Sequence, residues 1–158
     1  LGVPETTMLE LTPLRGIGRL LFGMTRAEVS SIFGSPSSRT SDDPGRETWF
    51  YAPLDLALYF DADDGWRLES IQAAHPDTCL LGVRVFRQPH LAVLTQRAAL
   101  GLSAPEVRSD ANTEEVEYHV RPHRLHLWRE GTHFTSCALG VPFGADDAPA
   151  WPHNPGNA

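Results

Sequence analysis

The chain has 158 residues and a mass of 17.4 kDa, and 41% of its residues are hydrophobic, which is enough apolar material for one core. It carries 13 basic residues, all of them arginine, against 20 acidic ones, so its formal charge is −7. The lack of lysine excludes Schiff-base and P-loop lysine chemistry. The acidic balance argues against a nonspecific nucleic-acid binder, and no apolar run approaches the roughly 18 residues of a membrane-spanning helix. A basic protein is the partner that suits such a charge.

The chain contains two cysteines, Cys79 and Cys137, which are too few for a disulfide framework or a four-cysteine zinc site. Free cysteine is among the most buried residue types. We therefore expect two reduced thiols in a cytoplasmic protein, although the sequence leaves an exported form open.

The first predicted element is a helix that begins after Thr25. Thr25 and Glu28 have the spacing of a capping box, in which a hydroxyl and a carboxylate satisfy free backbone N–H groups. Apolar Val29 follows at helical spacing, Gly34 can take a left-handed cap, and Pro36 prevents continuation. A polar loop is predicted for residues 35–46.

A β-hairpin is predicted next, because apolar and polar residues alternate on both sides of Pro53. With its tip at Pro53 and Leu54, Trp49 lies opposite Leu58. A third strand is predicted for residues 66–73.

The same order of elements is predicted again in the second half of the chain. A helix is expected from Pro89 to Leu100 and a polar loop over residues 103–114. A hairpin then places Tyr118 opposite Leu127, and a strand covers residues 132–139.

The two halves also match in sequence, because residues 47–59 align without a gap on residues 116–128 at an offset of 69. We therefore predict an α+β fold of two tandem units, each a helix followed by three antiparallel strands, with both helices packed on one sheet face. The units are residues 1–77 and 78–143, which form one compact domain. Residues 144–158 are rich in proline and glycine and are predicted to form a flexible tail.

The segment from Phe22 to Pro36 carries Gly23-Met-Thr25, Glu28-Val29 and Phe33-Gly34. It resembles the helix signature of the small outer-membrane assembly lipoproteins of the SmpA/OmlA type. Its duplication resembles the tandem architecture of the β-lactamase inhibitor protein. The chain lacks the cysteines of both groups, so inhibition of a β-lactamase is not carried over to it. The resemblance implies a noncatalytic binding module, such as an inhibitor or immunity protein, and we expect no cofactor.

The strand alternation also predicts which side chains point away from the helices. Aromatic and arginine side chains are enriched at the energetic centres of protein interfaces. An exposed sheet face that masks a partner protein is therefore the predicted working surface. Its candidate residues are Phe50, Tyr59, His119, Arg121, Arg124, His126 and Trp128.

The sequence leaves one other class of function open. The hairpin register makes His119 and His126 a cross-strand pair, which could share a zinc ion with Glu117 or His123 as a further ligand. The alternative is thus a small-ligand or metal-binding protein, or an enzyme, with a pocket between the two sheets near His119 and His126. A homodimer formed through one sheet face is a further alternative.

Overall fold

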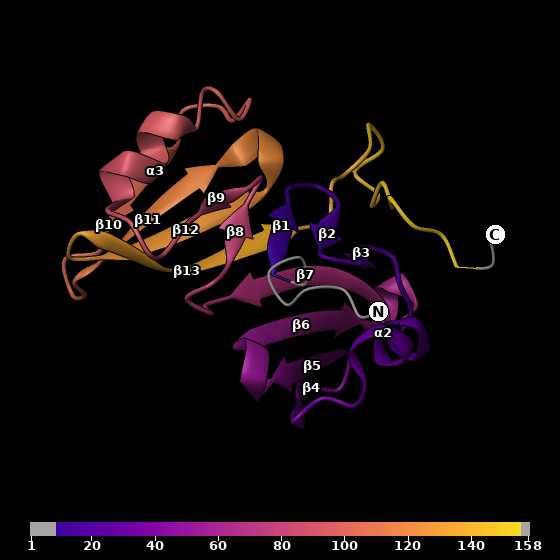
Figure 1. Cartoon of the computed structure of the whole chain (residues 1–158). Helices are drawn as coiled ribbons and strands as arrows, with labels where there is room; N and C mark the ends of the chain where they lie inside the picture. The colour runs from indigo at the N-terminus through magenta and orange to yellow at the C-terminus, as the bar shows by residue number, and fades with distance from the viewer. Residues whose placement is uncertain (1–8, 156–158) are drawn as a thin grey trace.

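The computed structural model describes residues 9–155, and most of its regular structure is β (Figure 1). The larger sheet has eight strands in the order β10-β11-β12-β13-β7-β6-β5-β4, and the smaller has five in the order β3-β2-β1-β8-β9. The larger sheet contains β4 Ser38–Asp43, β5 Arg46–Tyr51, β6 Leu56–Asp61, β7 Arg67–Ala73, β10 Glu106–Ser109, β11 Glu115–Val120, β12 Leu125–Glu130 and β13 His133–Gly140. The smaller sheet contains β1 Glu10–Thr12, β2 Gly16–Ile17, β3 Leu20–Leu21, β8 Cys79–Leu80 and β9 Val83–Arg84.

The eight-stranded sheet consists of two antiparallel four-stranded meanders, β4 to β7 and β10 to β13, that are joined edge to edge. The join is the antiparallel pairing of β13 with β7, in which Cys137 lies opposite Ala73 and Leu139 opposite Ile71. Each meander therefore has one free edge, at β4 and at β10.

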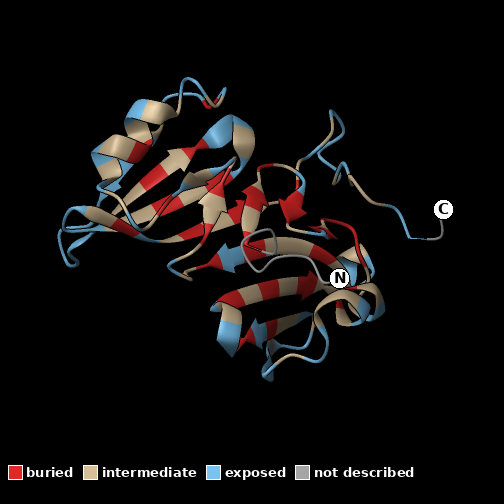
Figure 2. Cartoon of the chain, in the orientation of Figure 1, coloured by how far each residue is buried: buried red, intermediate tan, exposed pale blue. Residues whose placement is uncertain are grey.

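One face of this sheet is buried, as the alternation of side chains predicts. Trp49 pairs with Leu58 and Tyr118 with Leu127, and all four side chains are buried. The predicted register of both hairpins is thus confirmed. Buried and partly exposed residues alternate along β6 in Figure 2, which is typical of a strand with one face in the core.

The smaller sheet and the two helices pack on the buried face of the larger sheet. In the smaller sheet β1 pairs in parallel with β8, so Leu11 lies beside Leu80, and both are buried in the common core. Helix α2 (Arg26–Phe33) contacts the first meander, where the ring of Phe33 meets that of Tyr51 at 5.7 Å. Helix α3 (His90–Gln96) contacts the second, where His90 lies 6.0 Å from the ring of Phe134.

The N-terminus of α2 forms as the sequence predicts. Thr25 is the N-cap residue, and the capping box with Glu28 is complete in both directions. Helix α3 is shorter than predicted, because it ends at Gln96 and the chain continues in turns to residue 101. Neither helix in the described part of the chain is long and apolar enough to cross a membrane.

The prediction of an α+β fold with two helix-plus-three-strand units is wrong, because the structure is mostly β and is built from two sheets. Each predicted polar loop contains a fourth strand, β4 or β10, at a sheet edge. Strand β4 has only polar residues and β10 has one apolar residue, Val107, which is exposed, so neither strand shows an alternation of apolar and polar residues. The strands of the smaller sheet are two or three residues long, which is too short for a period to be visible.

Residues 144–155, within the segment predicted to be a flexible tail, return to the first half of the molecule. The Arg67 guanidinium donates to the carbonyl oxygens of Gly23 and His153 at 3.0 and 2.7 Å and stacks on the ring of Trp151. His153 Nε2 lies 2.8 Å from a carboxylate oxygen of Glu28. A Cβ atom on Gly23, whose φ is +102°, would lie 2.0 Å from the His153 carbonyl, so this approach requires glycine.

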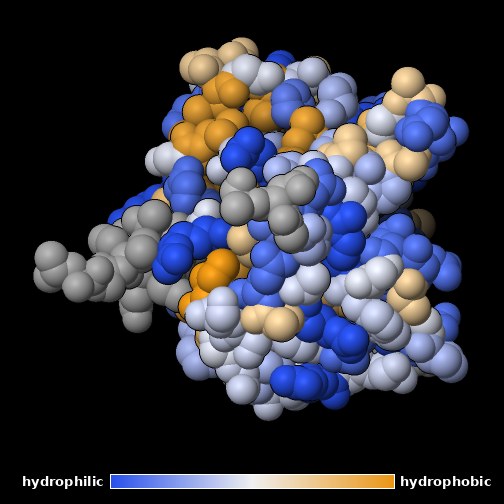
Figure 3. All heavy atoms as spheres, turned by 90° about the vertical axis from the view of Figure 1, so that its right-hand side faces the viewer, coloured by the Kyte–Doolittle hydropathy of each residue, from blue (hydrophilic) through white to orange (hydrophobic). Residues whose placement is uncertain are grey.

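Figure 3 shows the side of the molecule on which the described C-terminal segment ends. Hydrophilic residues cover most of this side, and hydrophobic residues gather in patches, mainly in the upper half of the view. This side is therefore a largely polar surface.

The two cysteines are both free thiols. Cys137 lies on the buried face of β13, and burial raises its thiol pKa to about 12. Burial also raises the pKa of Cys79. Because the thiolate is the nucleophile, neither cysteine is activated for chemistry at neutral pH.

Adjacent residues of β7 test which face of the sheet is buried. We expect Ile71→Ala to lower the free energy of unfolding by about 3 kcal/mol, because it leaves a cavity under the join of the two meanders. Gln72→Ala, on the opposite face, should change it by less than about 0.5 kcal/mol. Urea unfolding followed by circular dichroism measures both, and equal losses would contradict the assignment of faces.

Glu69 on β7 gives the fold a dependence on pH. Burial raises the pKa of Glu69 to about 7, and a shared hydrogen bond with Asp64 acts in the same direction, whereas Arg46 at 3.4 Å opposes the shift. Because this pKa lies above that of an unfolded glutamate, the neutral form favours folding. The stability that it contributes is complete at acid pH and is lost as the pH rises through about 7.

We therefore expect Glu69→Gln, which keeps a neutral hydrogen-bond donor, to become more stable relative to wild type as the pH rises from about 5 to 7. The difference should level off at higher pH. Unfolding free energies measured across this range test it, with Glu130→Gln on an exposed site as the control. A difference that stays constant with pH would show that Glu69 is ionised throughout.

Candidate functional site

The face of the eight-stranded sheet opposite the core is called the open face here. It consists of the side chains that alternate with the buried ones, and none of them is buried, whereas their neighbours on the same strands largely are. The open face comprises Ser38, Thr40, Arg46, Thr48, Phe50, Ala57, Tyr59, Asp61, Ser70, Gln72, Glu106, Arg108, Glu115, Glu117, His119, His126, Trp128, Glu130, Ser136 and Ala138.

One row of directly paired residues crosses the open face from edge to edge. At a strand spacing of about 4.8 Å, eight strands give a row of roughly 30 Å. Its centre carries no charge, because Ala57, Gln72 and Ala138 lie there. The row is Ser38, Phe50, Ala57, Gln72, Ala138, His126, His119 and Glu106.

Three planar rings form a stack on β11 and β12. The rings of His119 and His126 are 4.0 Å apart and nearly parallel, at 10°. The indole of Trp128 lies 5.7 Å from His126 at an angle of 13°. Glu117 fixes this arrangement, since its carboxylate lies 2.8 Å from His126 Nδ1. The four side chains form a preorganised aromatic surface.

The electrostatics of the stack disfavour charge on His119. Partial burial lowers the pKa of His119, and the neighbouring His126 and Arg121 act in the same direction when positively charged. Glu106 lies beside His119 in the row, but its carboxylate is held by Arg121, with Nη2 and Oε2 2.9 Å apart. This pairing lowers the pKa of Glu106.

The structure brings five of the seven predicted binding residues to the open face, in two groups. His119, His126 and Trp128 form the stack in the second meander. Phe50 and Tyr59 lie in the first meander, on β5 and β6, and the phenol of Tyr59 donates to Gln72 at 3.0 Å. The central strands β7 and β13 separate the two groups.

Arg121 and Arg124 lie in a turn between β11 and β12 and not on a strand of the open face. The predicted tight hairpin tip is a 3₁₀ helix, Arg121–His123, followed by Arg124 in the left-handed conformation with φ +51°. Arg121 is engaged with Glu106, and the Arg124 guanidinium stacks on Phe143 at 4.6 Å. The proline in each hairpin tip indicates a turn but does not specify the turn's conformation. The prediction therefore placed Arg121 and Arg124 on the sheet face instead of in the turn.

The alternative metal site near His119 and His126 does not fit their geometry. The lone pairs of an imidazole lie in the plane of its ring, so two stacked rings do not direct their nitrogens toward one ion. Residues 9–155 contain no group of three His, Cys, Asp or Glu side chains placed to hold a metal ion.

The pocket predicted between two sheets is also misplaced, because the two hairpins belong to one sheet. A pocket of about 260 Å³ lies at the edge of the open face beside Trp128. The hairpin between β10 and β11 forms its other wall. The residues that line this pocket are Arg108, Ser109, Asp110, Thr113, Glu115, Glu117 and Trp128.

The sequence prediction missed the centre and both edges of the open face. The central residues Ser70, Gln72, Ser136 and Ala138 lie on strands that were predicted, and their alternation with buried residues was available as a signal. What the sequence did not show is that β7 and β13 pair. The edge strands β4 and β10 were predicted as loops.

The chain was compared with known proteins by sequence and by structure. No protein-family model matches it, and no curated protein matches it significantly. An extracellular protein containing a SCP domain from Bacillus anthracis str. Ames has a similar structure, with a TM-score of 0.54 and 11% identity, over 75% of this chain and 43% of that one. A DUF4309 family protein from Bacillus subtilis subsp. subtilis str. 168 gives a TM-score of 0.44 and 16% identity, over 75% and 78% of the two chains.

The similarity to the Bacillus anthracis protein is one of fold and shows nothing of function. The chain spans less than half of the Bacillus anthracis protein. That protein is not described as a lipoprotein of the SmpA/OmlA type or as a β-lactamase inhibitor, so the comparison does not support that resemblance.

The stack makes a prediction about the pKa of His119. We expect His126→Gln to raise it, because the substitution removes a positive charge that opposes its protonation. Titration of the histidine ring protons by NMR measures this pKa, and His133→Gln on β13 is the control. An unchanged pKa of His119 in His126→Gln would show that the two rings do not interact.

Proposed function

We propose that this protein is a noncatalytic binding module that covers a basic surface of a partner protein with its open face. The observation that carries the proposal is the row of paired side chains that crosses all eight strands without being buried by any other element. A surface roughly 30 Å wide is of the size that protein interfaces use.

The composition of the open face suits protein recognition. Phe50, Tyr59 and Trp128 are large side chains held by rigid strands, and they flank a centre of small or neutral residues. Aromatic residues of this kind supply most of the energy in many interfaces, whereas the neutral surroundings exclude water. A protein that acts by covering its partner, as an inhibitor or immunity protein does, requires no catalytic residues.

Charge determines the kind of partner that we propose. The chain has a net charge of −7, and the carboxylates of Glu115, Glu117 and Glu130 lie at the Trp128 end of the sheet. Glu115 lies directly opposite Glu130, a like-charged pair that a cationic partner would stabilise. A basic contact surface therefore complements this end of the open face and accelerates association at low salt.

A catalytic role for the histidine pair receives less support from the geometry. The ring of His126 is bonded to Glu117. Within residues 9–155, no serine, threonine or cysteine is hydrogen-bonded to His119 or His126. A histidine that activates a nucleophile needs such a contact in its reactive geometry.

The test is capture of binding proteins from lysate by wild type, by Tyr59→Ala/Trp128→Ala, and by Leu91→Ala on the exposed surface of α3 as a control. We expect a basic protein that the control retains and the double variant loses. With that protein purified, each open-face substitution should weaken binding by about 2 kcal/mol, and affinity should fall with added salt. Calorimetry measures both effects, and the thermal stability of the variants shows that they are folded.

Two results would overturn the proposal. One is a bound protein that the double variant retains as well as wild type does. The other is self-association of the pure chain that Tyr59→Ala/Trp128→Ala abolishes in sedimentation, which would identify the open face as a contact between copies.

A further inference from the structure

A second candidate site lies away from the open face, between β9 and α3. A pocket of about 300 Å³ opens there, on the side of the eight-stranded sheet that carries the smaller sheet and the helices. Two guanidinium and two carboxamide groups line it, and no carboxylate does. The lining residues are Gly82, Val83, Arg84, Arg87, Gln88 and Gln96.

We propose that this pocket binds the carboxylate or phosphate group of a small molecule, with Arg84 as the principal contact. Such a concentration of cationic groups is unexpected on a chain whose net charge is −7. The proposal is independent of the function proposed for the open face.

The charge of Arg84 is available to a ligand, whereas that of Arg87 is partly used. Arg87 holds the carboxylate of Asp77, with its Nε and Nη2 at 2.8 and 2.7 Å from one oxygen. Arg84 is exposed, and no carboxylate oxygen in the described residues lies within 4.0 Å of its side-chain nitrogens. Arg87 thus pairs directly with Asp77, whereas Arg84 acts on Asp77 only at longer range, where its charge helps to lower the pKa of that carboxyl.

One acidic residue of the smaller sheet, Glu10, is hydrogen-bonded to the lining of the pocket. Glu10 lies in the same cross-strand row as Arg84, with Cys79 on the strand between them. The carboxylate of Glu10 accepts a hydrogen bond from the backbone N–H of Gly82. Two strand spacings, about 10 Å, separate the backbones of Glu10 and Arg84.

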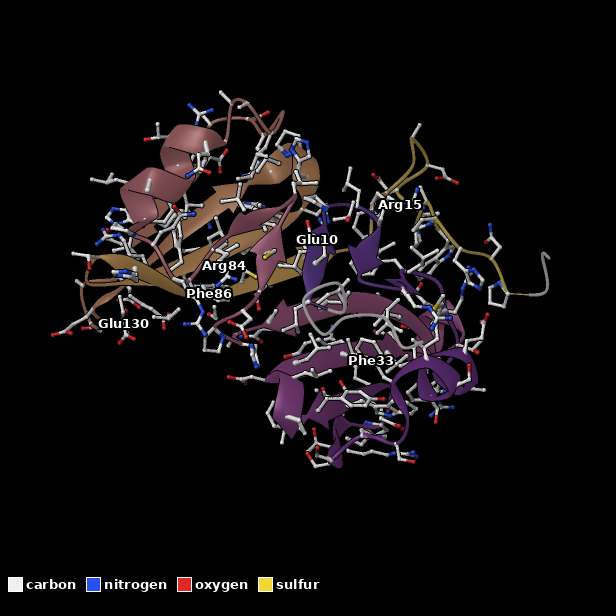
Figure 4. The ribbon with its side chains drawn as sticks, viewed as in Figure 1. Glu10, Arg15, Phe33, Arg84, Phe86 and Glu130 are labelled. Atoms are coloured by element: carbon white, nitrogen blue, oxygen red, sulfur yellow. The ribbon has the colours of Figure 1, made fainter. Side chains whose placement is uncertain are left out.

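The walls of the pocket are held in place from both sides. The Gln88 amide donates to the Arg84 carbonyl at 2.6 Å, and Gln96 donates to the Gln88 side chain at 3.3 Å and to the Ala92 carbonyl at 3.0 Å. Val85 is fully buried and Phe86 packs against the core, which anchors the segment between the two arginines (Figure 4). The backbone and the glutamine side chains of this open pocket are therefore held in place before a ligand binds, which lowers the entropic cost of binding.

The chemistry of the lining selects the ligand. A guanidinium group presents parallel N–H donors that match the oxygens of a carboxylate or phosphate. The volume of about 300 Å³ lies at the lower end of the range for small-molecule sites. A compact anion fits this site better than a large cofactor does.

The test is an NMR titration of the full chain with sodium phosphate and, separately, with sodium malonate, at an ionic strength of about 0.01 M, where screening is weak. We expect saturable shifts of the backbone amides of Gly82, Arg84, Arg87 and Gln88 and of the Gln96 side chain. Arg84→Ala should weaken binding at least about tenfold, the loss expected for a charge-assisted contact. Arg84→Lys should restore it only in part, because lysine lacks the planar fork.

The matched control is Arg15→Ala, which removes the same charge from an exposed position well away from the pocket (Figure 4). It should leave the affinity unchanged. Preference for phosphate over malonate, or the reverse, identifies which oxyanion the site takes. Equal shifts with sodium chloride, or equal affinity in wild type and Arg84→Ala, would overturn the proposal.

Discussion

The pairing of β7 with β13 is the interaction on which the rest of the structure depends. It joins two four-stranded meanders that are each too small to bury their own apolar faces. Its register places Ile71 opposite Leu139 in the core and Gln72 opposite Ala138 on the open face. A slip of one residue would exchange the two faces of a strand and so break both the core and the row that crosses the sheet.

The buried face and the open face of the sheet consequently have different roles. The smaller sheet, α2 and α3 cover the buried face, and the parallel pairing of β1 with β8 connects the beginning of the chain to its middle. Arg67 extends this connection by holding the C-terminal segment at His153 against Gly23. Because these contacts keep the sheet rigid from one side, the aromatic residues on its other side are preorganised for binding.

Local patterns in the sequence predicted the local parts of the structure. The capping box of Thr25 and Glu28, the pairing of Trp49 with Leu58, and that of Tyr118 with Leu127 all depend on residues near one another in the chain. Each of these features therefore appears in the sequence as a fixed spacing between residues of particular types. The open-face positions of Phe50, Tyr59, His119, His126 and Trp128 followed from the same alternation.

The parts that were missed depend on contacts between distant segments or on exposed polar strands. The pairing of β7 with β13 joins residues more than sixty positions apart, and no spacing in the chain encodes it. Strands β4 and β10 have polar residues on both faces because they lie at the sheet edges. Arg121 and Arg124 were placed on strands because a proline indicates a turn without giving its geometry. The pocket at Arg84 was missed because it combines both residues of the short strand β9 with others from the adjoining segments and from α3.

The central claim is that the two meanders form one continuous sheet with one open face. The most direct test is the measurement of nuclear Overhauser effects between β7 and β13. The account predicts contacts between backbone protons of Gln72 and Ala138, and of Ile71 and Leu139, together with slow exchange of the amides between them. If these contacts are absent while those within each hairpin are present, the meanders are separate and the continuous open face does not exist.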